Sequence, residues 1–252
     1  MAAMKRADIL KQRELHRGDP QEFLLGFFVN YSAPARLMHT FLPPTHGKEE
    51  ILQAAMRAYV IGIAACVETF FRDLYFHLLK RNPALLPRAL NESNRRDGVS
   101  RLPRFLAEGA SAEEFAASAS FQNAEAINQN VSIFFSTPFF DVLDQFELAC
   151  EVPSARRTGP ANLKLPSSWQ RDLDRVFSLR HEFAHDANSK TKVSAEEMQR
   201  IETTALLACQ FTALLSGIES QIIVGQKRLP VILLVADLIA DDWEVAENGS
   251  TT

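Results

Sequence analysis

The chain has 252 residues, of which 46% are hydrophobic and 23% are charged, a balance typical of a globular protein with a buried core. Its formal net charge is -4, so it lacks the overall positive charge that draws a protein to nucleic acid, and any contact with RNA must come from local basic patches. The three cysteines, Cys66, Cys150 and Cys209, form no Cys-x-x-Cys pair, which argues against a zinc site built from cysteines.

The cysteine count and the polarity of the first residues favour a reducing compartment. The count is odd, and Met1–Arg17 is too polar and charged for an export signal. A membrane span needs about 18 apolar residues, whereas the most apolar run, Ala58–Phe71, is shorter and includes Glu68. We therefore expect a cytoplasmic protein that makes no membrane contact.

Helical patterns dominate from the beginning of the chain. Residues 1–45 have apolar side chains at mixed three- and four-residue spacings, which predicts an N-terminal helical extension. The segment Lys48–Lys80 has no proline and is rich in Ala, Leu, Ile and Phe. We expect it to form one long buried helix that stops near Asn82-Pro83, because a residue before proline disfavours the helical conformation.

The middle of the chain is less regular. Residues 91–120 mix Arg, Gly, Ser and Ala, which predicts a long connection with short helical pieces. Phe139–Cys150 follows a proline and is predicted to be a helix, and Glu151–Pro166 is predicted to be a loop.

Two helical patterns follow in the last third. Ser167–Ala187 places its apolar residues on one face, as in an amphipathic helix. The next helix begins at the capping box Ser194-Ala-Glu-Glu197 and is expected to end near Gly225. Val231–Val235 is a candidate strand within an apolar segment and acidic tail, 227–252. The sequence thus predicts an all-α protein, with a helical bundle over residues 48–226.

One charged residue interrupts the apolar face of the amphipathic helix. Arg180 falls near the middle of this face, where an unpaired charge is costly. Glu68 is the corresponding single carboxylate in the apolar run Ala58–Phe71 of the other long helix. We therefore expect Glu68 and Arg180 to form an ion pair that allows both helices to be buried.

The residues from Arg180 to Asp186, Arg-His-Glu-Phe-Ala-His-Asp, concentrate titratable groups on one helix end. Arg180, a polar neighbour in His181, and His185 after four intervening residues resemble the motif of the HEPN superfamily. The upstream helix with its embedded Glu68, and the helix that begins soon after the motif, resemble the HEPN arrangement over roughly residues 48–225.

The resemblance implies a HEPN-like helical bundle that dimerises with two Arg/His motifs facing each other. It also implies an endoribonuclease that needs no metal or other cofactor, often a toxin or defence effector, with an antitoxin or regulatory protein as a further partner. HEPN toxins controlled by nucleotidyltransferase antitoxins have a tyrosine two residues after the histidine, whereas this chain has Ala187 there.

The residue types fit cleavage of RNA through its 2′-hydroxyl. His185 can accept the proton of the hydroxyl, and Arg180 can neutralise the charge that grows on the attacked phosphate. On an ideal helix the two side chains point about 140° apart, so a second subunit or a frayed helix end must bring them to one phosphate. Lys190 and Lys192 follow the motif directly and are candidates to hold RNA phosphates.

Two other interpretations use the same residues. His181-Glu182-Phe183-Ala184-His185 is a His-Glu-x-x-His sequence, in which His181 and His185 could bind zinc with Glu182 as general base of a peptidase. The third ligand would have to come from Glu196, Glu197 or Glu202. The remaining alternative is a non-catalytic helical module that binds a nucleotide or a protein, since a fold alone does not establish activity.

Overall fold

The computed structural model describes residues 26–27, 30–32, 34–36, 49–97, 112–151, 160–186, 189–216, 221–224 and 227–230. Within these ranges the chain is mainly helical, which confirms the predicted all-α class. Most of the predicted extension 1–45 and of the segment 227–252 lies outside the described residues, and so does the candidate strand Val231–Val235.

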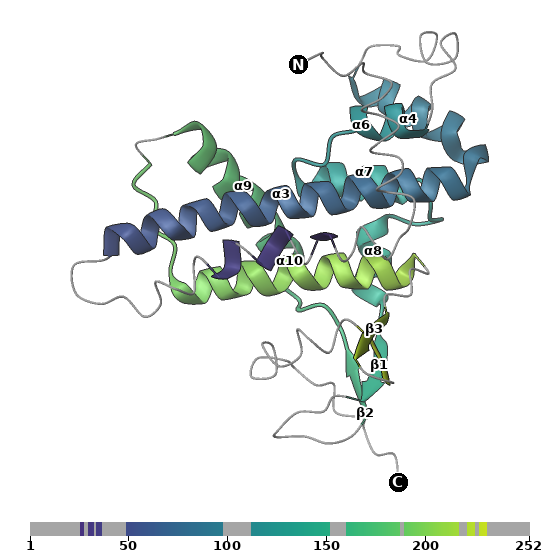
Figure 1. Cartoon of the computed structure of the whole chain (residues 1–252). Helices are drawn as coiled ribbons and strands as arrows, with labels where there is room; N and C mark the ends of the chain where they lie inside the picture. Colours follow the sequence, from purple (N-terminus) through teal and green to yellow (C-terminus); the bar gives the residue numbers. More distant parts are fainter. Residues whose placement is uncertain are drawn as a thin grey trace, which may run out of the picture.

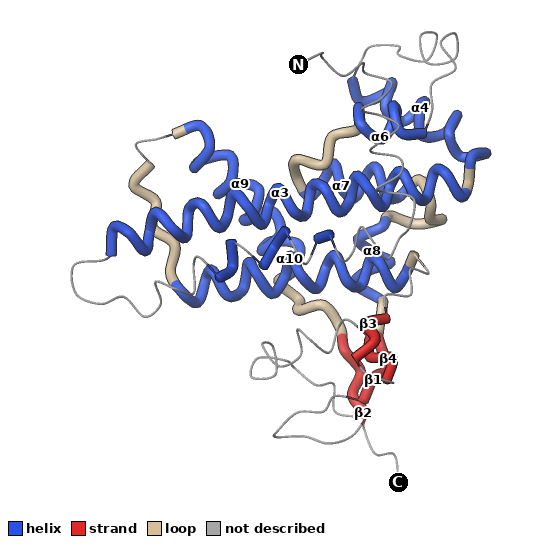
Figure 2. Tube along the Cα trace, viewed as in Figure 1, coloured by secondary structure: helices blue, strands red, loops and turns tan. Residues whose placement is uncertain are grey.

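The elements are arranged as one group of packed helices with two small hairpins at its edge (Figures 1 and 2). The helices are α3 (Glu49–Arg81), η1 (Pro83–Leu85), α4 (Leu86–Asp97), α6 (Ala112–Ser118), α7 (Ala124–Ser132), α8 (Phe139–Gln145), α9 (Trp169–His185) and α10 (Ala195–Leu215). The strands are β1 (Leu148–Glu151), β2 (Pro160–Leu163), β3 (Gln221–Val224) and β4 (Lys227–Pro230), paired antiparallel as β1–β2 and β3–β4.

The long helix α3 lies at the centre of the described part and packs against α6, α9 and α10. Its first turn has two acidic residues and its last turn has Lys80 and Arg81, which suits the partial charges at the two ends of a helix. The helix stops before Asn82-Pro83, as the sequence predicts. By length and composition α3 could cross a membrane, but its apolar window is mostly buried against the other elements, as in a core helix.

Aromatic side chains join the helices in the core. Phe71 of α3 meets Phe139 of α8 edge to face, with ring centroids 6.3 Å apart. Phe140 of α8 meets Trp169 of α9 in the same way at 4.6 Å. These contacts add to the burial of large apolar surfaces and anchor the short helix α8 between two long ones.

Two predicted helices are shorter than expected. The segment Phe139–Cys150 is helical only as far as Gln145, because Phe146 turns extended and the chain enters β1. Part of the predicted loop Glu151–Pro166 forms β2. The last helix ends at Leu215 instead of near Gly225, and Gln221–Val224 forms β3. In each hairpin the partner strand supplies the backbone hydrogen bonds, and such pairing is absent from the local pattern of a single segment.

Candidate functional site

The helix α9 positions the motif by burying its other face. Trp169, Leu173, Val176 and Leu179 are all fully covered, and the Trp169 indole donates to an Asp144 oxygen 2.5 Å away. This face holds α9 against α3 and α10 over its first three turns. The motif occupies the last turns, where α9 approaches the first half of α3 (Figure 1).

The predicted ion pair between Glu68 and Arg180 is present. The Arg180 Nη2 atom lies 3.6 Å from Glu68 Oε1, and the two side chains are 26% and 11% exposed. Burial raises the pKa of the Glu68 carboxyl, and the nearby charges of Arg180 and Arg72 oppose this rise. The pair is longer than a hydrogen bond, and Glu68 Oε1 is buried without a hydrogen-bond donor. Arg180 is therefore held by charge, and about a quarter of its side chain stays exposed to solvent.

The two histidines of the motif lie side by side at the surface. His181 and His185 are one helical turn apart, and their ring centroids are 4.7 Å from each other with both side chains exposed. Ala184 belongs to the apolar face that the sequence predicts for Ser167–Ala187, but it is exposed, because the last turn of α9 extends beyond the core. Phe183 is half-buried and has the Arg57 guanidinium 5.4 Å from the centre of its ring. The predicted position Ala187 lies outside the described residues.

Glu182 points away from the histidines and toward the connection between α9 and α10. Its Oε1 atom accepts hydrogen bonds from the hydroxyls of Ser189 and Thr191. The Ser189 hydroxyl, and then that of Thr191, hold the pKa of the Glu182 carboxyl below its usual value. This carboxylate therefore fastens the connection to α9, and its bonded oxygen is occupied.

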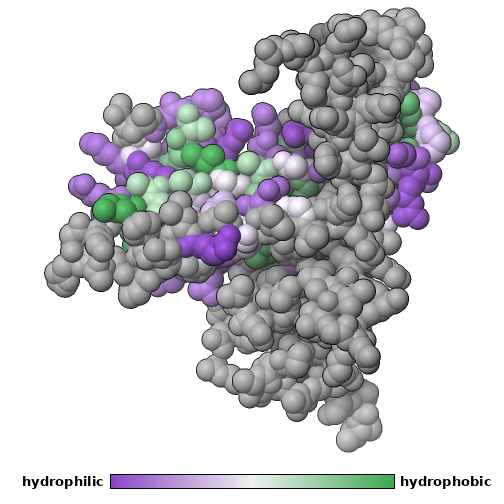
Figure 3. Space-filling model, viewed as in Figure 1, coloured by the Kyte–Doolittle hydropathy of each residue, from purple (hydrophilic) through white to green (hydrophobic). Residues whose placement is uncertain are grey.

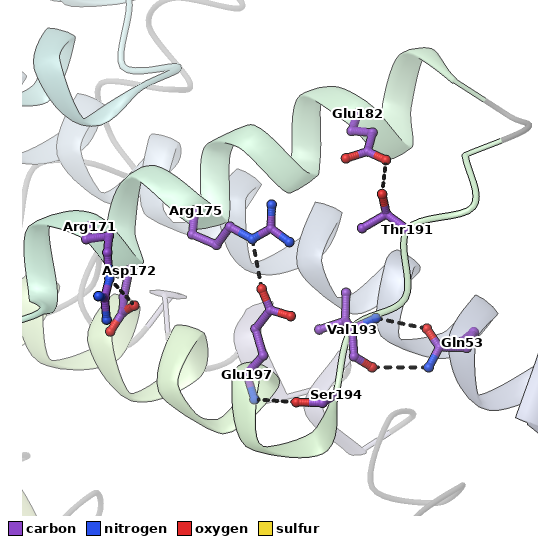
Figure 4. A network of polar contacts seen from close by, with 9 residues as sticks. All are labelled: Gln53, Arg171, Asp172, Arg175, Glu182, Thr191, Val193, Ser194 and Glu197. Atoms are coloured by element: carbon purple, nitrogen blue, oxygen red, sulfur yellow. Dashed lines mark hydrogen bonds and ion pairs between the residues drawn. The ribbon is translucent and has the colours of Figure 1, made fainter.

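Residues 189–193, which we call the strap, are fixed to α3 by a row of polar side chains. Arg57 donates to the carbonyl oxygens of Ser189 and Thr191, at 2.8 and 3.2 Å. Gln53 exchanges two hydrogen bonds with the backbone of Val193, both 3.1 Å long (Figure 4). Because Gln53 and Arg57 are four residues apart, they lie on one face of α3 and hold the strap along its length.

The capping box at the start of α10 forms only in part. Ser194 accepts a hydrogen bond from the Glu197 backbone N–H at 3.0 Å, as predicted. The Glu197 carboxylate does not close the box, because it accepts a hydrogen bond from Arg175 of α9 at 2.8 Å (Figure 4). This ion pair joins α9 to α10 and replaces the hydrogen bond that the Glu197 carboxylate would accept from the Ser194 backbone in a complete capping box.

The two candidate RNA-binding lysines stand in different environments. Lys192 forms an ion pair with Glu49 at 2.6 Å, and both side chains are well exposed. Lys190 is exposed and forms no ion pair with any residue that the structure describes. Lys190 is therefore the strap's available cation, whereas Lys192 already has a counter-charge.

The side chains needed for a zinc peptidase do not converge. Across the described ranges, no group of three His, Cys, Asp or Glu residues is close enough together to hold a metal ion. Glu196 is exposed, Glu197 is paired with Arg175, and burial raises the pKa of Glu202 to about 7. Glu182, the expected general base, is bound to the strap.

The strap contacts were missed at the level of sequence. Gln53, Arg57, Ser189 and Thr191 appear in no recognised motif, and the hydrogen bonds join segments more than 130 residues apart. A usable signal was present, since Glu49, Gln53 and Arg57 recur every four residues at the start of an otherwise apolar helix.

Comparison of this chain with protein-family models, with curated proteins and with solved structures finds no match.

The ion pair across α3 and α9 can be tested by a double-mutant cycle. We expect Arg180→Gln to destabilise the fold by about 1–2 kcal/mol at pH 8, because it leaves the buried Glu68 carboxylate without its nearest cation. Once Glu68 is replaced by Gln, the same change should cost much less. Urea unfolding of the four proteins measures the coupling, and effects that add within about 0.3 kcal/mol would contradict the pair.

The same cycle has an expected pH dependence. Arg180 opposes the rise in the Glu68 pKa, so Arg180→Gln raises the folded-state pKa further. A carboxyl whose pKa is higher in the folded than in the unfolded state destabilises the fold as pH rises from the unfolded value toward the folded one. The loss caused by Arg180→Gln should therefore be smaller near pH 4 than at pH 8.

Proposed function

We propose that the protein is a metal-independent endoribonuclease that works at the exposed end of α9. The observation that best supports this is that the imidazoles of His181 and His185 lie side by side and exposed at the end of α9. Arg180 is partly exposed on the same helix end, and the exposed Lys190 of the strap supplies a further cation. Together they supply bases and charge for attack of a ribose 2′-hydroxyl on the neighbouring phosphate. The HEPN-like spacing of Arg180 and His185 supports the same chemistry.

In this proposal the two histidines share the proton transfers. His185 accepts the proton of the 2′-hydroxyl, and the oxygen then attacks phosphorus to form a 2′,3′-cyclic phosphate. The bond from phosphorus to the 5′-oxygen breaks, and that oxygen needs a proton to leave as a hydroxyl. His181 is the imidazole next to His185 and is suited to supply this proton.

Arg180 is suited to hold the reacting phosphate. Its guanidinium has five N–H donors, and the pair with Glu68 at 3.6 Å leaves part of the side chain exposed. A phosphate whose charge grows during the attack would bind these donors more tightly than the ground state does. Glu68 then acts as a support that keeps Arg180 at the surface of α9.

A second copy of the chain is the partner that this site needs, because Arg180 and His185 diverge on their own helix. The exposed side of α3 offers a surface for it. Small and apolar residues recur there at alternating spacings of three and four, as in a helix that packs against another helix. They are Ile51, Ala54, Ala58, Ile61 and Ala65, of which Ile51 is 49% exposed and Ile61 is half-buried. Apolar surface is visible near the first half of α3 in Figure 3.

The primary test is cleavage of single-stranded RNA by the purified protein in excess EDTA. We expect cleavage to persist, because no proposed step uses a metal, and His185→Ala to reduce its rate by about 100-fold or more. Arg171→Ala serves as the control, since Arg171 is a well-exposed arginine in the first turn of α9.

Loss of activity in EDTA that returns with zinc would favour the peptidase-type metal site over the proposed chemistry. A folded, dimeric protein that cuts no RNA would favour the non-catalytic module. Circular dichroism and sizing of each variant distinguish these outcomes from simple unfolding.

The lysines of the strap give a second prediction. Lys190→Ala should weaken RNA binding and lower the slope of log Kd against log salt by about 0.7, the value for one phosphate contact on a single strand. Lys192→Ala should have a smaller effect, because Glu49 already neutralises this ammonium group. Fluorescence anisotropy with a 2′-O-methyl RNA measures both, and an equal or larger effect at Lys192 would contradict the assignment.

A further inference from the structure

A cleft lies between α4 and the turn that joins α7 to α8, among elements that do not include the motif end of α9. Its volume is about 440 Å³, within the range of sites for small ligands. The side chains around it are Arg88, Glu92, Asn128, Gln129, Ser132, Ile133, Phe135, Ser136, Thr137 and Pro138. None of these residues belongs to the proposed ribonuclease site.

Side-chain hydrogen bonds to the backbone hold one wall of the cleft in place. Ser132 Oγ accepts from the Phe139 N–H at 2.8 Å, and Asn128 Oδ1 accepts from the Phe140 N–H at 2.9 Å. These bonds occupy the first N–H groups of α8. They also fix the Asn128 amide with its oxygen toward α8, so that its Nδ2 group remains to donate elsewhere.

The cleft contains donors that the described structure does not use. Arg88 is exposed and forms no ion pair with a described residue. Ser136 and Thr137 are exposed, and their hydroxyls form no hydrogen bond within the described ranges. A guanidinium and two hydroxyls at one cleft suit an anion, and a guanidinium matches the two oxygens of a carboxylate.

The charged side chains and the apolar wall of the cleft indicate which kind of anion it would bind. Glu92 lies in the same cleft, and its carboxylate repels negative charge beyond the one that Arg88 can pair with. A ligand with a single negative charge is therefore favoured over a phosphate dianion. The other wall is apolar, with Ile133 buried and Phe135 stacked on Phe139 at 5.6 Å between ring centroids.

We propose that this cleft binds the carboxyl-terminal end of a peptide whose last side chain is apolar. Arg88 pairs with the terminal carboxylate, and the hydroxyls of Ser136 and Thr137 donate to its oxygens. The last side chain lies against Phe135 and Ile133. The free Nδ2 group of Asn128 donates to a carbonyl of the peptide backbone.

The test uses a fluorescent hexapeptide of five alanines and a C-terminal leucine, titrated with the full chain and followed by anisotropy. We expect binding in the range up to about 1 mM, and at least about tenfold weaker binding when the terminal carboxylate is amidated. Arg88→Gln should cause a similar tenfold loss. Arg200→Gln, which removes an exposed arginine of α10, should cause none.

The weakest affinity expected is about 1 mM, so the absence of binding by the free acid at that concentration would overturn the proposal. Equal binding of the acid and the amide would overturn it too, and so would an Arg88→Gln variant that binds as tightly as the unchanged protein. Free leucine that competes as well as the hexapeptide would overturn the peptide assignment. Circular dichroism confirms that each variant is folded, and the binding measurement does not depend on whether the protein cleaves RNA.

Discussion

The buried carboxylate of the central helix α3 is the constraint on which much of the described structure depends. Glu68 lies in the most apolar stretch of α3, where burial raises its pKa, and the charge of Arg180 in α9 opposes this rise most strongly. The pairing joins the motif end of α9 to the middle of α3. Because the contact is an ion pair longer than a hydrogen bond, the arginine can meet both the buried carboxylate and a ligand at the surface.

The strap adds further contacts to the ion pair and fixes the surface next to the motif. Arg57 and Gln53 hold its backbone to α3, and Glu182 ties its hydroxyls to α9. The network explains why Glu182 stands between two histidines and yet faces away from them. The Glu182 carboxylate, which the sequence offered as a general base, holds the strap instead, and the imidazoles of His181 and His185 are left exposed at the surface.

The sequence predicts the parts of this structure whose physics is local. The periodicity and proline positions give α3, α9 and α10, and the cost of unpaired buried charge gives the pair of Glu68 with Arg180. The hairpins, the strap and the cleft could not be predicted in the same way, since each depends on groups brought together from distant segments. Arg57 and Ser189, for example, are 132 residues apart. The exposure of Ala184 on the predicted apolar face could not be predicted either, because the helical pattern does not show where the core ends.

The central claim is that the end of α9 cleaves RNA through the 2′-hydroxyl beside the scissile phosphate. The most direct measurement compares an RNA that the protein cuts with the same sequence bearing a single 2′-deoxy nucleotide at the cleavage position. The account predicts that cutting stops at that position alone, and that the unmodified RNA yields a 2′,3′-cyclic phosphate and a 5′-hydroxyl. Cutting at an unchanged rate next to the deoxy nucleotide would contradict it.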